Sequence, residues 1–202
     1  RGEYLFKEGE PVKGFYFVHS GKVKIHKRWG EYKDLIVKFA GKMDILGHRG
    51  MVGNQSYPIS ATAIEDCNVC FITTEFFNTT LMVNHELAYQ MVLFYADELQ
   101  RAELGMRNML HMDVKSRIAD TLLKLKDGFG SDSSGLINCN LTRQDVASYA
   151  GTTYESLFKI MHELAEEQVI ETSGKSISIK NEHRLRGLIK LPQNKIPTAV
   201  DQ

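Results

Sequence analysis

Apolar residues in the first third of the chain fall in short runs separated by glycine and polar turns. Residues 15–18 and 23–26 flank a Ser20-Gly21 turn, which predicts a β-hairpin. Further short runs of strand character follow at 35–39, 45–46, 59–64 and 69–72. Strands this closely spaced predict a small β-barrel or β-roll rather than a parallel sheet.

A long helical pattern follows the strands. Residues 84–112 contain no proline and one glycine, with Asn84 as the expected N-cap and Glu86 in the first turn. An apolar stripe runs along this segment and consists of Leu87, Met91, Phe94, Ala102, Met106 and Met109. A helix of this length spans about 42 Å, more than a small barrel covers. We therefore expect part of the stripe to meet a second copy of the chain. The alternative is a helix packed wholly within its own chain.

The most informative pattern lies near the C-terminus, where residues 142–167 predict two short helices joined by a turn at Gly151. Thr152 and Glu155 have the spacing of a capping box that would begin the second helix. The inward face of that helix is apolar and consists of Leu157, Ile160, Met161 and Leu164. The outward residues at its start are Tyr154, Glu155, Ser156 and Lys159. A helix-turn-helix presents such residues to base edges in the major groove.

Segments on both sides of this motif complete a winged helix-turn-helix. Asp113 predicts the cap of a helix that extends to Lys126, a polar loop covers 127–135, and residues 136–141 predict a short strand. After the motif, residues 169–172 and 176–179 flank a Ser173-Gly174-Lys175 turn. This second hairpin predicts a wing beside the recognition helix.

Composition limits these expectations. The chain has 202 residues, is 43% hydrophobic, and balances 25 Lys and Arg against 25 Asp and Glu. Positions 113–202 are also neutral, with twelve residues of each sign. Neutrality counts against DNA binding, because phosphate contacts normally supply most of the affinity. A basic face can still form from Arg143, Lys159, Lys175, Lys180, Arg184 and Arg186. There is no apolar run near the ~18 residues of a membrane helix, and three cysteines, an odd number, fit a reducing cytoplasm.

In their order along the chain, the strands, long helix and winged helix-turn-helix resemble the Crp/Fnr family, the cyclic-AMP receptor protein and fumarate–nitrate regulators. Four passages carry this resemblance over nearly the whole chain: GFYFVHSG at 14–21, DILG at 44–47, DVKSRIA at 113–119, and TRQD at 142–145 with the helix after it. The resemblance implies a homodimeric bacterial transcription factor that reads a palindromic DNA operator and works with RNA polymerase. It also implies a small-molecule effector that binds in the β-roll and reorients the DNA-binding domains through the long helix.

The resemblance assigns DNA contacts by position. The residues that match phosphate contacts are Thr142, Arg143, Gln144 and Thr153. The residues that match base-reading positions are Tyr154, Glu155 and Lys159, which are Arg, Glu and Arg in the receptor-protein branch. Glu155 suits a cytosine amino group, and Lys159 keeps a cation without the bidentate fork. Tyr154 cannot make an arginine's contact with guanine, so the half-site should differ there. Glu155 acting only in a capping box is the alternative.

The resemblance also locates an effector pocket, where the chain departs from cyclic-nucleotide-binding members. Those members hold the ribose and cyclic phosphate with a Gly-Glu pair and an Arg-Ser/Thr pair, and face the adenine with a pair on the long helix. The corresponding residues here are Gly47, His48, Tyr57, Pro58, Ala102 and Glu103. Arg49 lies near the pocket as a cation. Losing both the carboxylate and the guanidinium removes most affinity for the nucleotide, so we expect an effector other than cyclic AMP.

The cysteines and histidines are candidates for other sensing chemistry. Cys67 and Cys70 have the spacing of a metal or redox pair, but residues i and i+3 of a strand point to opposite faces. This favours buried, inert thiols, and Cys139 is expected in the core. Haem is an alternative cofactor, with His48, His85 and His111 as candidate ligands. There is no Walker, Gly-x-Ser-x-Gly or His-Glu-x-x-His motif, so the sequence predicts no enzyme.

The sequence therefore predicts an α+β chain with three parts. These are a β-roll effector-sensing domain at 1–83, a long dimerisation helix at 84–112, and a winged helix-turn-helix DNA-binding domain at 113–202. The expected dimer contacts are Leu87, Met91, Phe94, Met106 and Met109. We expect a cytoplasmic homodimeric regulator with no membrane association. The alternative is a ligand-sensing or protein-interaction module that has lost DNA binding. Effector, operator and sign of regulation are not specified by the sequence.

Overall fold

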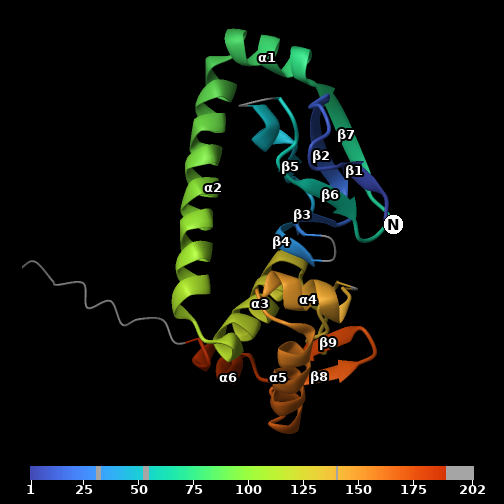
Figure 1. The fold of residues 1–202 in the computed structure, drawn as a ribbon, viewed down its shortest axis with the longest axis vertical. Helices are drawn as coiled ribbons and strands as arrows, with labels where there is room; N and C mark the ends of the chain where they lie inside the picture. The colour runs from blue at the N-terminus through green and yellow to red at the C-terminus, as the bar shows by residue number, and fades with distance from the viewer. Residues whose placement is uncertain (31–32, 52–54, 140, 190–202) are drawn as a thin grey trace, which may run out of the picture.

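The N-terminal half is a roll of two antiparallel sheets (Figure 1). The computed structural model describes residues 1–30, 33–51, 55–139 and 141–189. One sheet has the order β1-β6-β3-β4 and consists of Tyr4–Phe6, Ser60–Ala63, Val23–Trp29 and Lys33–Ala40. The other has the order β5-β2-β7 and consists of Ile45–Leu46, Gly14–Ser20 and Asn68–Thr73. A short 3-10 helix, η1 (His48–Met51), follows β5.

The predicted strands form, but the predicted hairpin at Ser20-Gly21 is wrong. β2 pairs with β5 and β7, whereas β3 pairs with β4 and β6, so this turn carries the chain from one sheet to the other. Gly21 has a φ of +91°, and a Cβ there would lie 2.5 Å from the Cys67 sulfur. The crossing therefore packs tightly against the segment before β7 and requires glycine. Apolar periodicity predicts strands, but it does not predict their partners.

Two helices follow the roll. The first, α1 (Thr74–Val83), was not predicted. Asn84 then caps α2 (His85–His111) as predicted, and its side chain accepts a hydrogen bond from the Leu87 backbone N–H at 2.9 Å. Among residues 85–111, all of which are described, none is fully buried. In Figure 1, α2 runs beside the roll and down to the C-terminal domain. No helix in the described ranges is long and apolar enough to cross a bilayer.

The C-terminal domain contains the expected motif and wing. Its elements are α3 (Val114–Phe129), α4 (Arg143–Tyr149), α5 (Tyr154–Glu166), β8 (Ile170–Ser173), β9 (Ser176–Ile179) and α6 (Glu182–Gly187). Asp113 caps α3 as predicted, and the turn between α4 and α5 places Gly151 at a φ of +62°. One core, which includes Leu122, Leu157 and Leu164, joins α3 to α5. The last part of the predicted domain, 190–202, lies outside the described residues.

Two local predictions in this domain are wrong. The described part of 136–141 is not a strand, because Leu136 and Ile137 make only isolated bridges to Ser178 and Ser131. The capping box belongs to α4, where Thr142 and Asp145 exchange side-chain and backbone contacts. The cap of α5 is Thr153, one residue later than predicted. Adjacent threonines make a cap ambiguous in the sequence, since either side chain can accept the bond.

The C-terminal domain docks on the roll through α4 and β4. The Phe39 ring of β4 lies 4.9 Å from the Tyr149 ring of α4, centroid to centroid. Lys24 Nζ on β3 donates to Asp145 Oδ1 at 2.8 Å, and the Ile36 N–H donates to Ser148 Oγ at 3.0 Å. Burial acts to raise the pKa of Asp145, but hydrogen bonds from Lys24 and Thr142 outweigh it and lower the pKa. The docked pair is therefore ionised at neutral pH.

We predict that Lys24→Ala loosens this docking without unfolding either domain. The Lys24–Asp145 pair is largely shielded from water, with 21% and 14% of the two side chains exposed. Loss of the pair should lower the free energy of local opening of α4 by about 1 kcal/mol. This corresponds to a roughly fivefold faster amide hydrogen exchange in α4. The matched control is Lys27→Ala on the same strand, whose 3.7 Å pair with Glu8 is more exposed. Equal exchange in both variants would show that the pair does not hold the domains together.

Candidate functional site

The first candidate site is the outward face of α5 with the wing beside it. Tyr154, Glu155 and Lys159 are all exposed there, because Leu157, Met161 and Leu164 take the inward face. A hydrogen bond from its own backbone N–H, and then one from Thr153, lowers the pKa of Glu155. The face therefore offers a phenol, an ionised carboxylate and an ammonium within the first two helical turns. Such a set can accept from and donate to base edges.

The predicted phosphate residues have separate surroundings. Thr142 and Thr153 cap α4 and α5, with their hydroxyls on the backbone N–H groups of Asp145 and Ser156. Thr142 and Gln144 line an open cleft of about 830 Å³ that also borders Lys24 and Asp34 of the roll. They therefore face the roll across this cleft. The interdomain arrangement in which they do so was not predictable from local sequence.

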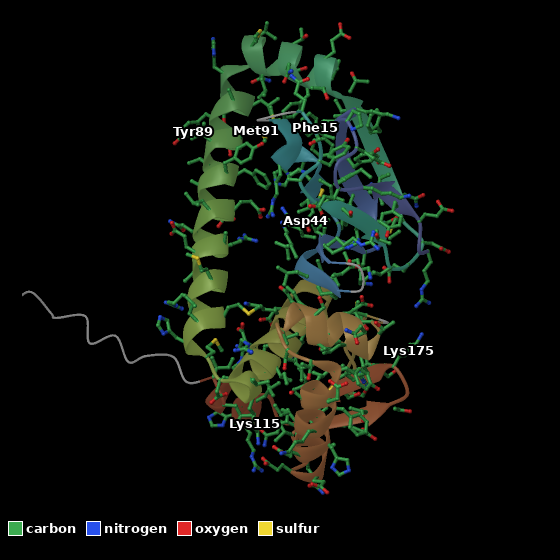
Figure 2. The ribbon with its side chains drawn as sticks, in the orientation of Figure 1. Phe15, Asp44, Tyr89, Met91, Lys115 and Lys175 are labelled. Carbon is green, nitrogen blue, oxygen red and sulfur yellow. The ribbon has the colours of Figure 1, made fainter. Side chains whose placement is uncertain are left out.

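Arg143 is engaged within the domain. Its guanidinium donates to the carbonyl oxygens of Gly174, Lys175 and Ser176 at 3.0–3.3 Å. Two of these carbonyls belong to the turn of the wing, which Figure 2 marks at Lys175, and the third to the first residue of β9. In this structure Arg143 fixes the wing to the start of α4. Its predicted role at a phosphate would require it to share or leave these contacts.

A second arginine, which was not singled out as a site residue, joins the turn of the motif to the end of α2. Arg117 of α3 donates to the carbonyl oxygens of Met112, Ala150 and Gly151 at 2.9–3.1 Å. Met109 of α2 approaches the same turn, because a Cβ on Gly151 would lie 2.5 Å from its sulfur. The end of α2 is thus in contact with the helix-turn-helix.

The second candidate site is a pocket in the roll. The residues brought together there from the predicted set are Gly47, His48, Arg49, Tyr57 and Pro58. Ala102 and Glu103 do not line it and lie exposed on α2. The enclosed space is about 10 Å³, which is enough for about one water molecule. Neither a cyclic nucleotide nor haem fits this space without displacing side chains.

Sequence reasoning missed the central residue of this pocket, Glu98 of α2. Its carboxylate lies 3.0 Å from Lys38 Nζ, 3.0 Å from an Arg49 guanidinium nitrogen and 3.8 Å from His48 Nε2. Its side chain is 10% exposed. The signal was present, because Glu98 interrupts the apolar stripe four residues after Phe94. A charge on an inward stripe requires partners, but the sequence does not say which.

In this cluster three basic side chains, those of Lys38, His48 and Arg49, surround one carboxylate. The neighbouring His48 ring, together with Lys38 and Arg49, holds the pKa of the Glu98 carboxyl well below its usual range, although burial acts to raise it. His48 is buried, and its Nδ1 lies 3.1 Å from the Ile45 carbonyl oxygen. Its Nε2 lies 3.8 Å from the Glu98 carboxylate and has no hydrogen-bond partner among the described residues. The pocket thus contains three side chains that could bind an anion. In this structure they pair with the carboxylate of Glu98.

The predicted dimer residues of α2 fall on different faces. Leu87, Met91 and Phe94 are half-buried, and the Phe94 ring lies 5.0 Å from the His48 ring. In Figure 2, Met91 lies on the side of the roll and Tyr89 on the outer side. Met109 contacts Gly151, and Met106 lies on the outer face, 63% exposed. The predicted stripe is therefore mainly the face that α2 turns toward its own chain.

The remaining sensing candidates have no assembled site. His85 and His111 are exposed at the first and last positions of α2. Cys70 is exposed, which contradicts the expected burial, whereas Cys67 and Cys139 are half-buried. Burial raises the pKa of the Cys139 thiol to about 12, so it is unreactive. Within the described ranges, no group of three His, Cys, Asp or Glu side chains is placed to hold a metal ion.

Comparison with known proteins agrees with this arrangement. Residues 1–84 match the family described as cyclic nucleotide-binding domain, and residues 116–188 match the Crp-like helix-turn-helix domain. A CRP-like cAMP-activated global transcriptional regulator of Mycobacterium tuberculosis is 27% identical over 92% of this chain and 84% of its own length. The anaerobic regulatory protein of Bacillus subtilis is 29% identical over 89% of this chain and 78% of its own.

Solved structures share the fold. The structure of FixK2 from Bradyrhizobium japonicum covers 95% of both chains with a TM-score of 0.84 and 23% sequence identity. TTHB099, a transcriptional regulator of the CRP family from Thermus thermophilus, covers 94% of both with a TM-score of 0.80 and 19% identity. At these identities the likeness concerns the arrangement of β-roll, long helix and helix-turn-helix.

We predict that Glu98→Gln destabilises the protein in a pH-dependent way. A carboxyl whose pKa is lower in the folded state adds stability above its unfolded pKa, near 4.5, and loses it as the pH falls toward the folded value. At pH 7 the substitution should cost about 2 kcal/mol, below the roughly 3–5 kcal/mol of a fully buried pair, because Lys38 and Arg49 keep water contact. Urea unfolding of parent and variant at pH 7 and pH 3 measures the difference.

The control for this experiment is Glu86→Gln, twelve residues earlier on the same helix and exposed, where the amide oxygen can still accept the hydrogen bond from Gln90. It should leave stability unchanged at both pH values. The difference in the free energy of unfolding between the parent and Glu98→Gln should be smaller at pH 3 than at pH 7. A difference that does not change with pH would mean that the ionised carboxylate is not the source of the effect.

Proposed function

The chain belongs to the Crp/Fnr family of DNA-binding transcriptional regulators, and on this premise we propose a homodimer that reads a palindromic operator under the control of a small anionic effector. The observation that carries the proposal is the exposed face of α5 beside the wing, with Tyr154, Glu155 and Lys159 turned outward. The base-reading role of these three residues is part of the proposal. The dimer acts in the bacterial cytoplasm, with RNA polymerase as a further partner.

A heptad pattern on the outer face of α2, apolar at every position except Glu103, supports the dimer. Residues spaced three and four apart form this outer seam: Tyr89, Val92, Ala96, Leu99, Glu103, Met106 and Leu110. All seven are exposed, including Leu99 at 61% and Leu110 at 74%. A 3-4 repeat of apolar residues is the pattern by which two helices pack along one another. The outer seam replaces the stripe Leu87, Met91 and Phe94 as our proposed dimer contact.

The docking of α4 supports a resting state with restricted DNA access. Thr142 and Gln144 border the cleft shared with the roll, so DNA phosphates would need to enter there or the domain would need to move. The Lys24–Asp145 pair and the Ser148 contacts hold α4 in this position. Release of these contacts is the step at which we propose that the effector acts.

The pocket around Glu98 supports an anionic effector. Lys38, His48 and Arg49 converge on one carboxylate, which a ligand carboxylate or phosphate would replace. Replacement would release α2 from the roll and open a cavity that is otherwise filled. Cyclic AMP is disfavoured, because position 48 is histidine where a carboxylate would accept from the ribose hydroxyl. A ligand that binds more tightly when α2 is released from the roll would shift the equilibrium toward that state. The difference in its affinity for the two states is the free energy that couples the pocket to the DNA-binding domain.

We predict that Lys159→Ala weakens binding to the preferred operator by about tenfold and relaxes the choice of base that Lys159 faces. The experiment selects duplexes from a random library with the full chain and then measures affinity by fluorescence anisotropy. Lys124→Ala on α3 is the charge-matched control and should change affinity little. Retention of no duplex at low salt would contradict the proposal and favour a ligand-sensing or protein-interaction module. Unchanged affinity and base choice in Lys159→Ala would remove that residue from the reading face.

We predict that Leu99→Glu converts the dimer to a monomer. The substitution places two carboxylates opposite each other in the outer seam, where like charges and loss of apolar burial both oppose association. Sedimentation velocity of the parent and the variant at micromolar concentration measures this. Leu93→Glu, on a side face of the same helix and 46% exposed, is the matched control and should remain dimeric. A dimeric Leu99→Glu variant would contradict the outer seam.

A further inference from the structure

Two aromatic side chains on α5 are left uncovered by their own chain. Phe158 is 61% exposed and Tyr154 is 44% exposed. Their rings lie nearly parallel, at 18°, with centroids 6.4 Å apart. Since they stand one helical turn apart, they form a continuous apolar ridge on the face that also carries Glu155 and Lys159. The core does not need either ring, because Leu157, Met161 and Leu164 fill the inward face.

The surroundings of this ridge indicate a partner that is anionic and locally apolar. Lys159 follows Phe158 directly, and the wing places Lys175 on the same domain. In the major groove, phosphates supply the negative charge, and the 5-methyl of thymine is the apolar group among the base edges. Guanine, adenine and unmodified cytosine carry no methyl group at these edges. A phenyl ring therefore distinguishes thymine by contact, not by hydrogen bonding.

We infer that Phe158, supported by Tyr154, reads thymine methyl groups and makes an A·T pair a fixed part of each half-site. This inference rests on the proposed DNA binding and adds Phe158 to the base-reading residues proposed above. Phe158 and Tyr154 are separated by about 6 Å along the helix axis, which exceeds one base-pair step of about 3.4 Å. The ridge is therefore long enough to contact more than one base pair.

The test uses the full chain and an operator selected from a random duplex library. Each thymine of one half-site is then replaced by deoxyuridine, which removes the methyl and leaves base pairing unchanged. At one position the parent should bind about fourfold more weakly, the factor that corresponds to one methyl group. Phe158→Ala should bind the thymine and uracil duplexes equally, whereas Phe158→Leu should keep part of the preference. Phe76→Ala on α1, with a ring 63% exposed, is the control and should match the parent.

Each outcome decides the inference. Loss of the methyl preference in Phe158→Ala with unchanged helix content supports it. A parent that binds the operator but ignores every methyl overturns it while the proposed function stands. A parent that retains no duplex overturns both. Unchanged DNA affinity in Phe158→Ala overturns it as well, even if the variant loses contact with another protein.

Discussion

The carboxylate of Glu98 is the contact that fixes the long helix α2 beside the β-roll. α2 has no fully buried residue, so its position beside the roll is set by a few side chains and not by a continuous core. Glu98 reaches Lys38 on β4 and His48 and Arg49 on η1, and Tyr95 adds a hydrogen bond to the His48 carbonyl oxygen at 3.0 Å. A shielded ion-pair cluster can add little net stability when complete, but it is costly when one partner is lost, because a charge is then left unpaired. It is therefore suited to two discrete positions of the helix.

Local patterns predict most elements of this fold, although not α1, because these elements are encoded by their own residues. The caps Asn84 and Asp113 and the glycine at 151 are examples in which side chain and backbone satisfy one another within a few positions. The sheet partners of β2 and β3 are not encoded in this way. They depend on which faces close around Val18, Val23 and Ile25, and this requires strands distant in sequence.

The candidate sites likewise include one that local sequence predicts and one that depends on residues distant in sequence. The outward residues of α5 follow from helical periodicity, because an inward apolar face leaves the others exposed. The two faces of α2 do not, since both carry apolar residues and a stripe from either fits the sequence. Only the contact of Phe94 with His48, and the charge of Glu98 among cations, distinguishes the inner face. Ala102 and Glu103 were placed in the pocket by resemblance, and the course of α2 takes them past it.

The distance from Glu98 to the C-terminal end of α2 sets how far that end would move if the helix tilted. Met109 lies eleven positions after Glu98, which is about 16 Å along the axis of α2. A tilt of about 10° around the anchor would move the sulfur by about 3 Å, close to the width of an atom. Met109 lies against the turn at Gly151, so under the proposed mechanism a tilt of α2 would displace the turn between α4 and α5. Arg117 of α3 donates to the carbonyl oxygens of Ala150 and Gly151 in that turn, so α3 would move together with it.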